Sequence, residues 1–312
     1  MANQVDTLRI SKFTAEIGMA LAQQGGMLRS SITYKGGMEV GKKAVVENLV
    51  GQVNATVIEG RFADVVPIDA PLTRRWYTPK RVGVALWADT FDNLITNIDL
   101  RGPYQTAMLD AMRREEDQNI LKAAFGTSLT GEEGATSETF VEDTAGAGQN
   151  TVAESVGGAN TGLSFAKLRA VREAMTRANV NLDQPVYMVI SELDESALMA
   201  EQTGTAGAYI AMSGDYVNGT VYQTGKLPAL MGFNFIKMSS ATLALAGLYD
   251  GSHIYSLPVY VKSGLAMGAW DDLSIEMYAL QRKWSTWEIK SEMTHGYTRL
   301  EPFKLMKVKT YY

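Results

Sequence analysis

The chain has 312 residues, of which 46% are hydrophobic and 20% are charged. This is the composition of a globular protein with one or two domains. The formal net charge of −5 argues against a basic surface that grips nucleic acid. The absence of cysteine excludes disulfides, thiolate nucleophiles and cysteine-ligated zinc. No signal peptide and no run of about eighteen apolar residues is present, so we expect a soluble intracellular product with no membrane partner.

The first part of the chain predicts one helix followed by extended strands. Residues 6–24 carry apolar side chains at helical spacing, and Gly25-Gly26 ends that run. From 31 to 88, short runs rich in valine, isoleucine, threonine and tyrosine are interrupted by glycine and proline. This pattern predicts extended strands and a long hairpin. A hairpin with so little core of its own would need another subunit to lie on.

A long helix is predicted over residues 103–125. It begins at Pro103 and ends before Gly126, which are the preferred residues at these two helix ends. Its length corresponds to about 34 Å. Its ends are apolar, whereas residues 113–119 are polar almost all round. We interpret it as a spine with a solvated middle, whose two arginines can pair with Asp117; charges that contact another subunit are the alternative.

Residues 127–162 are acidic and rich in glycine, with six acidic and no basic side chains. So long a stretch without a helical or strand pattern is uncommon inside a compact domain. We expect a projecting or mobile loop.

The second half of the chain alternates helices and strands, which predicts an α+β protein. Ser191 and Asp194 have the spacing of a capping box at the start of a helix. The expected elements are a helix over 165–178, a buried strand over 185–190, a strand over 231–239, a hairpin over 248–261 turning at Asp250-Gly251, and final strands around a turn at His295-Gly296.

One segment comes within a residue of a phosphate-binding loop. Gly36, Gly41 and Lys42 have the glycine and lysine spacing of that motif, but Lys43 stands where a serine or threonine should hold magnesium. The segment before it is not a buried strand. We therefore prefer glycines that let an extended loop bend and lysines that meet acidic partners.

Nothing else in the sequence predicts an active site, a metal site or a cofactor site. His253 and His295 lie far apart in turn-like sequence, and each is expected to be an exposed or half-buried structural residue. No nucleophile-elbow motif is present. Two acidic pairs, Glu132-Glu133 and Asp271-Asp272, lie in sequence where carboxylates are usually just solvated. We therefore expect no enzyme, with no catalytic, metal-binding or cofactor-binding residue.

Residues 74–81 mix basic and aromatic side chains. Such a stretch could stack on single-stranded nucleic acid. Because the whole chain is negatively charged, we favour a strand that packs its aromatic side chains on a neighbouring subunit.

The order of these parts resembles the tailed-bacteriophage major capsid proteins of the Hong Kong 97 fold. No single motif is specific; the order and spacing over nearly the whole chain carry the resemblance. The matching runs are Trp87 to Tyr104, the helix with Arg113-Arg114, Asp117 and Ile120 up to Gly126, the helix 165–178 leading to Pro185–Ser191, Gly232–Ile236, and Trp287 through Gly296 to Pro302 and Val308.

The resemblance implies a division into an arm, an extended loop and two domains. These would be an N-terminal arm over 1–30, an extended loop over 31–88, a peripheral domain over 89–179 and 285–312 with the spine helix 103–125 and the acidic loop 127–162, and an axial domain over 180–284. The family's known crosslink joins a lysine and an asparagine of different subunits. Lys35, Lys42, Lys43 and Lys80 are candidates for it by location only, and no crosslink is predicted.

The function implied by the resemblance is self-assembly into hexamers and pentamers of an icosahedral phage head that encloses double-stranded DNA without sequence-specific binding. The expected location is the virion capsid, after synthesis in the host cytoplasm. Because the chain begins close to the arm, we expect a separate scaffolding protein, and a portal, as partners. A nanocompartment shell protein of the encapsulin type is the alternative, and a nucleotide-binding enzyme that uses residues 36–43 is a remote one.

Overall fold

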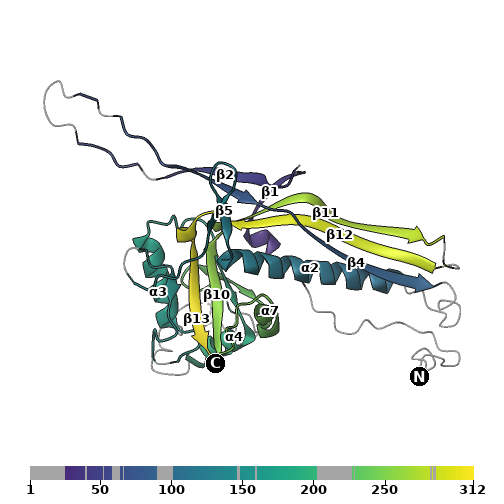
Figure 1. Cartoon of the computed structure of the whole chain (residues 1–312). Coiled ribbons are helices and arrows are strands. Elements are labelled where there is room, and N and C mark those ends of the chain that lie inside the picture. Colours follow the sequence, from purple (N-terminus) through teal and green to yellow (C-terminus); the bar gives the residue numbers. More distant parts are fainter. Residues whose placement is uncertain are drawn as a thin grey trace.

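The computed structural model combines helices with three β-sheets (Figure 1). The α+β fold class predicted from the sequence is therefore confirmed. The helix predicted over 6–24 lies outside the described residues. Those residues are 25–38, 41–51, 53–57, 64–65, 67–89, 101–145, 148–158, 160–201, 227, 229–281, 283 and 286–312.

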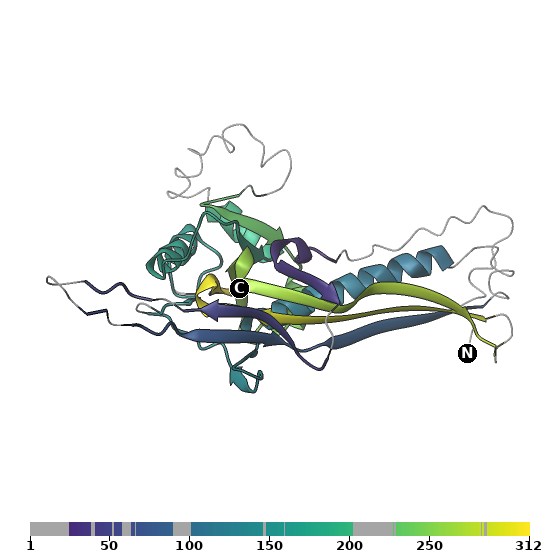
Figure 2. The same ribbon diagram turned by 90° about the horizontal axis from the view of Figure 1, so that it is seen from above.

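The longest sheet has four strands in the order β1-β11-β12-β4. Its strands are β1 (Thr33–Met38), β4 (Lys80–Asp89), β11 (Leu265–Ala279) and β12 (Thr286–Arg299). β1 runs parallel to β11, and the other neighbours are antiparallel. The helix α2 (Arg101–Phe125) lies along this sheet in both views (Figures 1 and 2). The long helix predicted over 103–125 is confirmed.

The strand β12 runs straight through His295-Gly296, so the turn predicted there is wrong. Gly296 lies opposite Gly268 of β11, and the ring of Tyr77 packs over both. A Cβ on Gly268 would lie 2.2 Å from the Tyr77 ring, and one on Gly296 would lie 2.8 Å from it. Because these two glycines have no side chain, the Tyr77 ring can pack directly against the backbone of β11 and β12.

The second sheet has five strands in the order β7-β13-β10-β8-β9 and carries the main core. Its strands are β7 (Thr151–Val152), β8 (Val186–Ile190), β9 (Phe233–Lys237), β10 (Ile254–Val261) and β13 (Leu305–Tyr311). β10 is antiparallel to β13 and to β8, whereas β8 is parallel to β9. The strands predicted over 185–190 and 231–239 are confirmed. The tight turn at Asp250-Gly251 is confirmed too, since the amide of Asp250 donates to the carbonyl of Ile254.

Three helices pack with the second sheet. They are α3 (Phe165–Arg177), α4 (Glu192–Glu201) and α7 (Ser240–Leu245). The helix α3 buries Leu168, Val171 and Met175, as its apolar spacing predicts. The capping box at the start of α4 is confirmed, because the amide of Ser191 donates to the Asp194 carboxylate at 2.9 Å and the amide of Asp194 donates to the Ser191 hydroxyl at 3.2 Å.

The third sheet has the order β2-β3-β5-β6 and forms the base of the long hairpin. Its strands are β2 (Ala44–Val50), β3 (Leu72–Tyr77), β5 (Ser128–Thr130) and β6 (Thr136–Glu138). The hairpin predicted within 31–88 is confirmed by the antiparallel pairing of β2 with β3. The prediction of a structureless loop over 127–162 is wrong, because β5, β6 and β7 all lie in it and β5 pairs with β3.

The strand pairing crosses the domain boundaries expected from the sequence. β11 begins inside 180–284, yet it pairs with β1 and β12 in the long sheet. β13 lies inside 285–312, yet it pairs with β10 in the second sheet. The division into domains stays a prediction, and its boundaries need to follow the sheets.

Arg299, the last residue of β12, joins the parts of the fold. Its side chain is 1% exposed. It donates to the carbonyls of Ala124 and Gly126 at the end of α2, at 3.0 and 3.1 Å, and to the carbonyl of Glu138 in β6 at 3.3 Å. A helix end leaves carbonyls without intrahelical partners, and a buried guanidinium satisfies them here.

We expect Arg299→Ala to lower the free energy of unfolding of the unassembled subunit by roughly 3 kcal/mol, because it leaves buried carbonyls unpaired. Denaturant unfolding followed by circular dichroism measures this. Arg299→Lys keeps the charge but offers fewer donors in a fixed plane, so its loss should be smaller. An Arg299→Ala curve that overlays the wild-type curve would contradict the role of Arg299 as a junction.

Candidate assembly surfaces

The extended hairpin is anchored at its base. Ala44, Val46 and Tyr77 pack with Ala266, Leu300 and Trp270 in a small buried cluster. The Trp270 indole NH also donates to the carbonyl of Gly41 at 3.0 Å. The base of the hairpin therefore moves with the long sheet.

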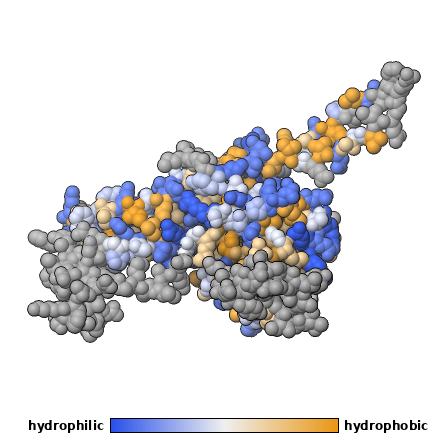
Figure 3. All heavy atoms as spheres, turned by 180° about the vertical axis from the view of Figure 1, so that it is seen from behind, coloured by the Kyte–Doolittle hydropathy of each residue, from blue (hydrophilic) through white to orange (hydrophobic). Residues whose placement is uncertain are grey.

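The described outer part of the hairpin carries exposed apolar side chains. We call the described residues beyond the hydrogen bond from the Gly51 amide to the Pro71 carbonyl, at 2.7 Å, the loop tip; they are 53–57, 64–65 and 67–70. Val57 is 81% exposed and Val65 is 92% exposed. Figure 3 shows hydrophobic side chains along this projecting part. Exposed apolar surface that projects from the body gains free energy when another surface covers it.

A second exposed apolar group lies at the far end of the long sheet. Trp87 of β4 and Met277 and Tyr278 of β11 are exposed there. The Trp87 indole NH lies 3.3 Å from a Glu288 carboxylate oxygen, and the Lys283 ammonium lies over its ring. This end is a second candidate contact surface.

The basic aromatic stretch 74–81 is engaged within its own chain. Arg75 pairs with Glu138, and Arg81 pairs with Glu292. The Tyr77 ring is buried, edge-on to Trp270 at a centroid distance of 5.2 Å. The prediction that these aromatic side chains pack on a neighbouring subunit is wrong for Tyr77. Cations that are already paired also do not favour the single-stranded nucleic acid interpretation.

The polar middle of α2 is solvated only in part, since Arg113 is exposed whereas the side that faces the chain is not, so the interpretation of a wholly solvated middle is wrong. Glu116, Asp117 and Asn119 are buried. The Asp117 carboxylate accepts the backbone amides of Gly26, Met27 and Leu28, at 2.7, 3.1 and 3.0 Å. It holds residues 25–32, which we call the inner segment, against the helix, in place of the expected pair with an arginine.

Beside this anchor lies a group of charges that joins the inner segment, α2 and β11. Arg29 donates to the Asp272 carboxylate at 3.2 Å and lies 3.6 Å from a Glu116 carboxylate oxygen. Burial raises the pKa of Glu116, and the nearby Arg29 charge opposes that rise. Asp272 is therefore not merely solvated, as its sequence context suggested. The acidic residues of this group fix where the inner segment can lie.

His295 is fully buried next to these charges, although the sequence predicted an exposed or half-buried residue. Its Nε2 lies 3.3 Å from a carboxylate oxygen of Asp272, and its Nδ1 lies 3.3 Å from the Tyr297 hydroxyl. Burial lowers the pKa of His295 below 6.5, and the Asp272 carboxylate only partly opposes this. The imidazole is therefore neutral near pH 7. His253, in contrast, is exposed in the turn before β10, as expected.

The segment that resembles a phosphate-binding loop lacks the geometry of one. It leads into the strand β2, whereas phosphate binding of that kind needs the N-terminus of a helix. Lys43 donates to the carbonyl of Gly134 at 2.9 Å, and Lys35 lies 3.4 Å from a Glu47 carboxylate oxygen. Residues 39 and 40 lie outside the described part of the chain.

Among the described residues, no three His, Cys, Asp or Glu side chains gather as a metal-binding group. No helix in this part of the chain is long and apolar enough to cross a membrane. Lys80, one of the lysines considered for a crosslink, donates to the Asn119 side-chain oxygen of its own chain at 2.6 Å.

Sequence reasoning missed the two residues that matter most for the position of these surfaces. Arg299 ends a strand and carried no motif. Asp117 was noticed as a charge in a polar run, and its neighbours Glu116 and Asn119 are buried with it. The one available signal was the polar run between the apolar ends of the helix. Such a run is compatible with a solvated surface and equally with polar side chains that are buried in hydrogen bonds.

Comparisons with known proteins agree on one family. A family model described as phage capsid protein matches residues 5–311. No curated protein sequence matches the chain.

Several solved structures are similar over almost the whole chain. The capsid of cyanophage Pam1 has a TM-score of 0.72 and 11% identity, covering 100% of this chain and 99% of that chain. The capsid of cyanophage P-SCSP1u has a TM-score of 0.69 and 13% identity, covering 99% and 95%. The capsid of a native GTA particle has a TM-score of 0.67 and 12% identity, covering 97% and 96%. The predicted resemblance to phage capsid proteins and their fold is confirmed.

We expect Asp117→Asn to loosen the inner segment, because an amide loses one acceptor and the charge that three backbone donors share. The amides of residues 26–28 should exchange with deuterium faster, and the free energy of unfolding should fall by about 2 kcal/mol. Hydrogen-exchange mass spectrometry of the unassembled subunit measures the first effect. Asp110→Asn on the same helix is the matched control and should leave these amides protected; equal protection in both variants would contradict the anchor.

His295 predicts a pH dependence of stability. Its pKa is lower in the folded chain than in the unfolded chain, so between these two values the unfolded chain binds a proton that the folded chain does not. The free energy of unfolding should therefore gain a falling component as the pH drops below about 6.5. His295→Gln removes this component. The difference in free energy of unfolding between wild type and this variant should therefore be smaller at pH 5.5 than at pH 7. Unfolding curves at both pH values measure it, and a constant or larger difference would contradict the assignment.

Proposed function

Because the chain belongs to the phage capsid protein family, we propose that its copies form hexamers and pentamers that close into an icosahedral head around double-stranded DNA. Family membership establishes a structural protein of a phage capsid. The finer assembly, its contents and its partners are our proposal. No catalytic step is needed for this function, and none of the arrangements described above suggests one.

The observation that carries the proposal is the loop tip. It projects from the body with apolar side chains that its own chain leaves uncovered, while its base is fixed to the long sheet. A projecting hairpin with so little core of its own gains stability when a second copy covers it. In a shell every copy can both offer a loop tip and receive one, since heterologous contacts repeat around a ring.

We propose a domain division that follows the strand pairing. The N-terminal arm keeps its expected extent, 1–30, and the extended loop spans about 41–79. The long sheet and α2 form the peripheral domain, which includes β4, β11 and β12. The second sheet forms the axial domain, which includes β8, β10 and β13. This division keeps the strands of the long sheet in one body and those of the second sheet in another.

The charge of the chain supports a container that encloses DNA without gripping it. Tight phosphate binding needs many free lysines and arginines, and the net charge is −5. We propose a scaffolding protein and a portal as assembly partners, synthesis in the host cytoplasm and final location in the virion. The nanocompartment alternative has no specific observation in its favour, and the nucleotide-binding alternative lacks the helix that it requires.

We expect purified wild-type protein, alone or co-expressed with its neighbouring genes, to form closed shells or capsomer rings in electron microscopy. Val57→Glu with Val65→Glu should leave the subunit folded, because both side chains are exposed, and should prevent assembly, because each copy would bury two charges. Circular dichroism and sedimentation velocity measure fold and assembly.

Val141→Glu, at a side chain that is 72% exposed outside the loop, is the control and should assemble. A wild-type protein that stays monomeric under both conditions would contradict the proposed function. Shells formed by the variant with Val57→Glu and Val65→Glu would contradict the role of the loop tip but not the proposed function.

A further inference from the structure

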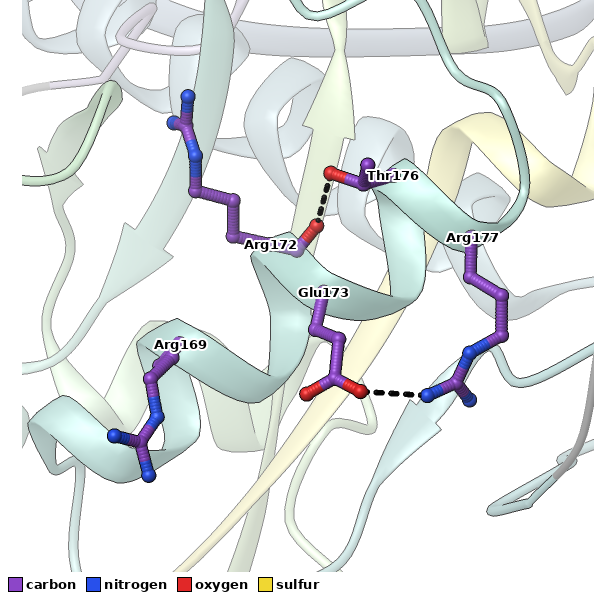
Figure 4. Close-up of a pocket in the computed structure, with 5 residues that line it drawn as sticks. All are labelled: Arg169, Arg172, Glu173, Thr176 and Arg177. Carbon is purple, nitrogen blue, oxygen red and sulfur yellow. Dashed lines mark hydrogen bonds and ion pairs between the residues drawn. The ribbon is translucent and has the colours of Figure 1, made fainter.

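The helix α3 presents a basic face. Arg169, Arg172, Glu173, Thr176 and Arg177 are exposed and line an open hollow of about 550 Å³ (Figure 4). Arg177 donates to Glu173 at 2.7 Å and to the side-chain oxygen of Gln149 at 3.2 Å, and Arg172 donates to the carbonyl of Met231. No acidic partner for Arg169 is found among the described residues. Three arginines and one glutamate leave a net positive face on a chain whose net charge is negative.

The turn between β5 and β6 presents an acidic tip. Glu132 and Glu133 are exposed there. The backbone of the turn is held from below, because the Trp76 indole NH donates to the carbonyl of Gly131 at 2.8 Å and Lys43 donates to that of Gly134 at 2.9 Å. Within the part of the chain that is described, neither carboxylate has an ion-pair partner. Lys43 and Arg74 donate to backbone carbonyls of this turn, Arg74 to that of Glu132 at 3.4 Å, and so leave the two carboxylates themselves without an ion pair among the described residues.

Within one copy these two features lie apart. In Figures 1 and 2 the hairpin of β5 and β6 lies beside β2 and β3. The helix α3 lies beside the second sheet, away from this hairpin. The acidic tip and the basic face can therefore meet only between two copies. A ring closed by rotation needs this arrangement, since each heterologous contact joins two different surfaces of the subunit.

We infer that the acidic tip of one copy, Glu132 and Glu133, docks on the basic face of the next copy, Arg169 and Arg177. This rests on the proposed assembly into rings. Opposite charges on complementary surfaces orient the approach of two copies and fix their register. Arginine and glutamate have long side chains, so the same contact can form at the two slightly different angles that rings of six and of five require.

The test is a charge exchange. Glu132→Arg with Glu133→Arg, and Arg169→Glu with Arg177→Glu, should each lower the assembled fraction by at least about tenfold, because like charges would then face one another. The four changes combined should restore assembly, since they rebuild the attraction in reverse and return the net charge to its original value. Arg172 stays unchanged because it donates to the chain's own backbone.

Matched controls separate the contact from charge and folding effects. Lys122→Glu with Lys262→Glu changes the net charge by the same amount as Arg169→Glu with Arg177→Glu, but at exposed lysines elsewhere. This control should assemble normally. Each variant's unfolding midpoint is measured on the unassembled subunit. If a reversed variant does not fold, Arg169→Gln with Arg177→Gln replaces it, and its assembly should weaken and become less sensitive to salt.

The outcomes separate the contact from the proposed function. Restored assembly in the combined variant supports the contact. Wild-type-like assembly of either reversed pair, or no restoration, overturns it while wild-type shells still form. Normal shells with less packaged DNA in the arginine variant also overturn it, because the arginines would then contact DNA. Absence of shells from the wild-type protein would instead remove the proposed function on which the contact rests.

Discussion

The architecture depends on one buried guanidinium. Arg299 ends β12 almost fully buried, and a charge so placed must use its donors or destabilise the fold. It donates to the carbonyls at the end of α2 and to one in β6. These contacts join the long sheet, the spine helix and the sheet at the base of the extended hairpin. Arg299 therefore holds both the end of α2 and the sheet from which the hairpin leaves the body.

This arrangement separates a rigid base from an uncovered tip. Tyr77 packs over Gly268 and Gly296, and Trp270 holds the carbonyl of Gly41, so the root of the hairpin cannot move independently of the sheet. Of the described residues beyond Gly51, Val57 and Val65 stay largely exposed. A pre-positioned loop loses less conformational entropy when it binds than a free one does. Folding of the subunit thus prepares an assembly surface without completing it.

Local patterns predicted the elements whose partners are near in sequence. The spine helix lies between Pro103 and Gly126, α3 has an apolar stripe, and the Ser191 capping box spans three residues, so each could be recognised. The errors fall where a partner is distant. Asp117 accepts an amide 91 residues away, which its charged neighbourhood could not indicate. Gly296 was taken as a turn because the ring that needs its space, Tyr77, lies on another strand.

The anchors of this fold place few demands on the side chains of their partners. Arg299 donates to backbone carbonyls, and Asp117 accepts backbone amides, so neither contact depends on the side chains of its partners. Every residue except proline offers both backbone groups. Partner segments can therefore change most of their side chains while the contact is kept, provided that the apolar spacing is kept. An identity of 11–13% with capsids of the same fold is compatible with contacts of this kind.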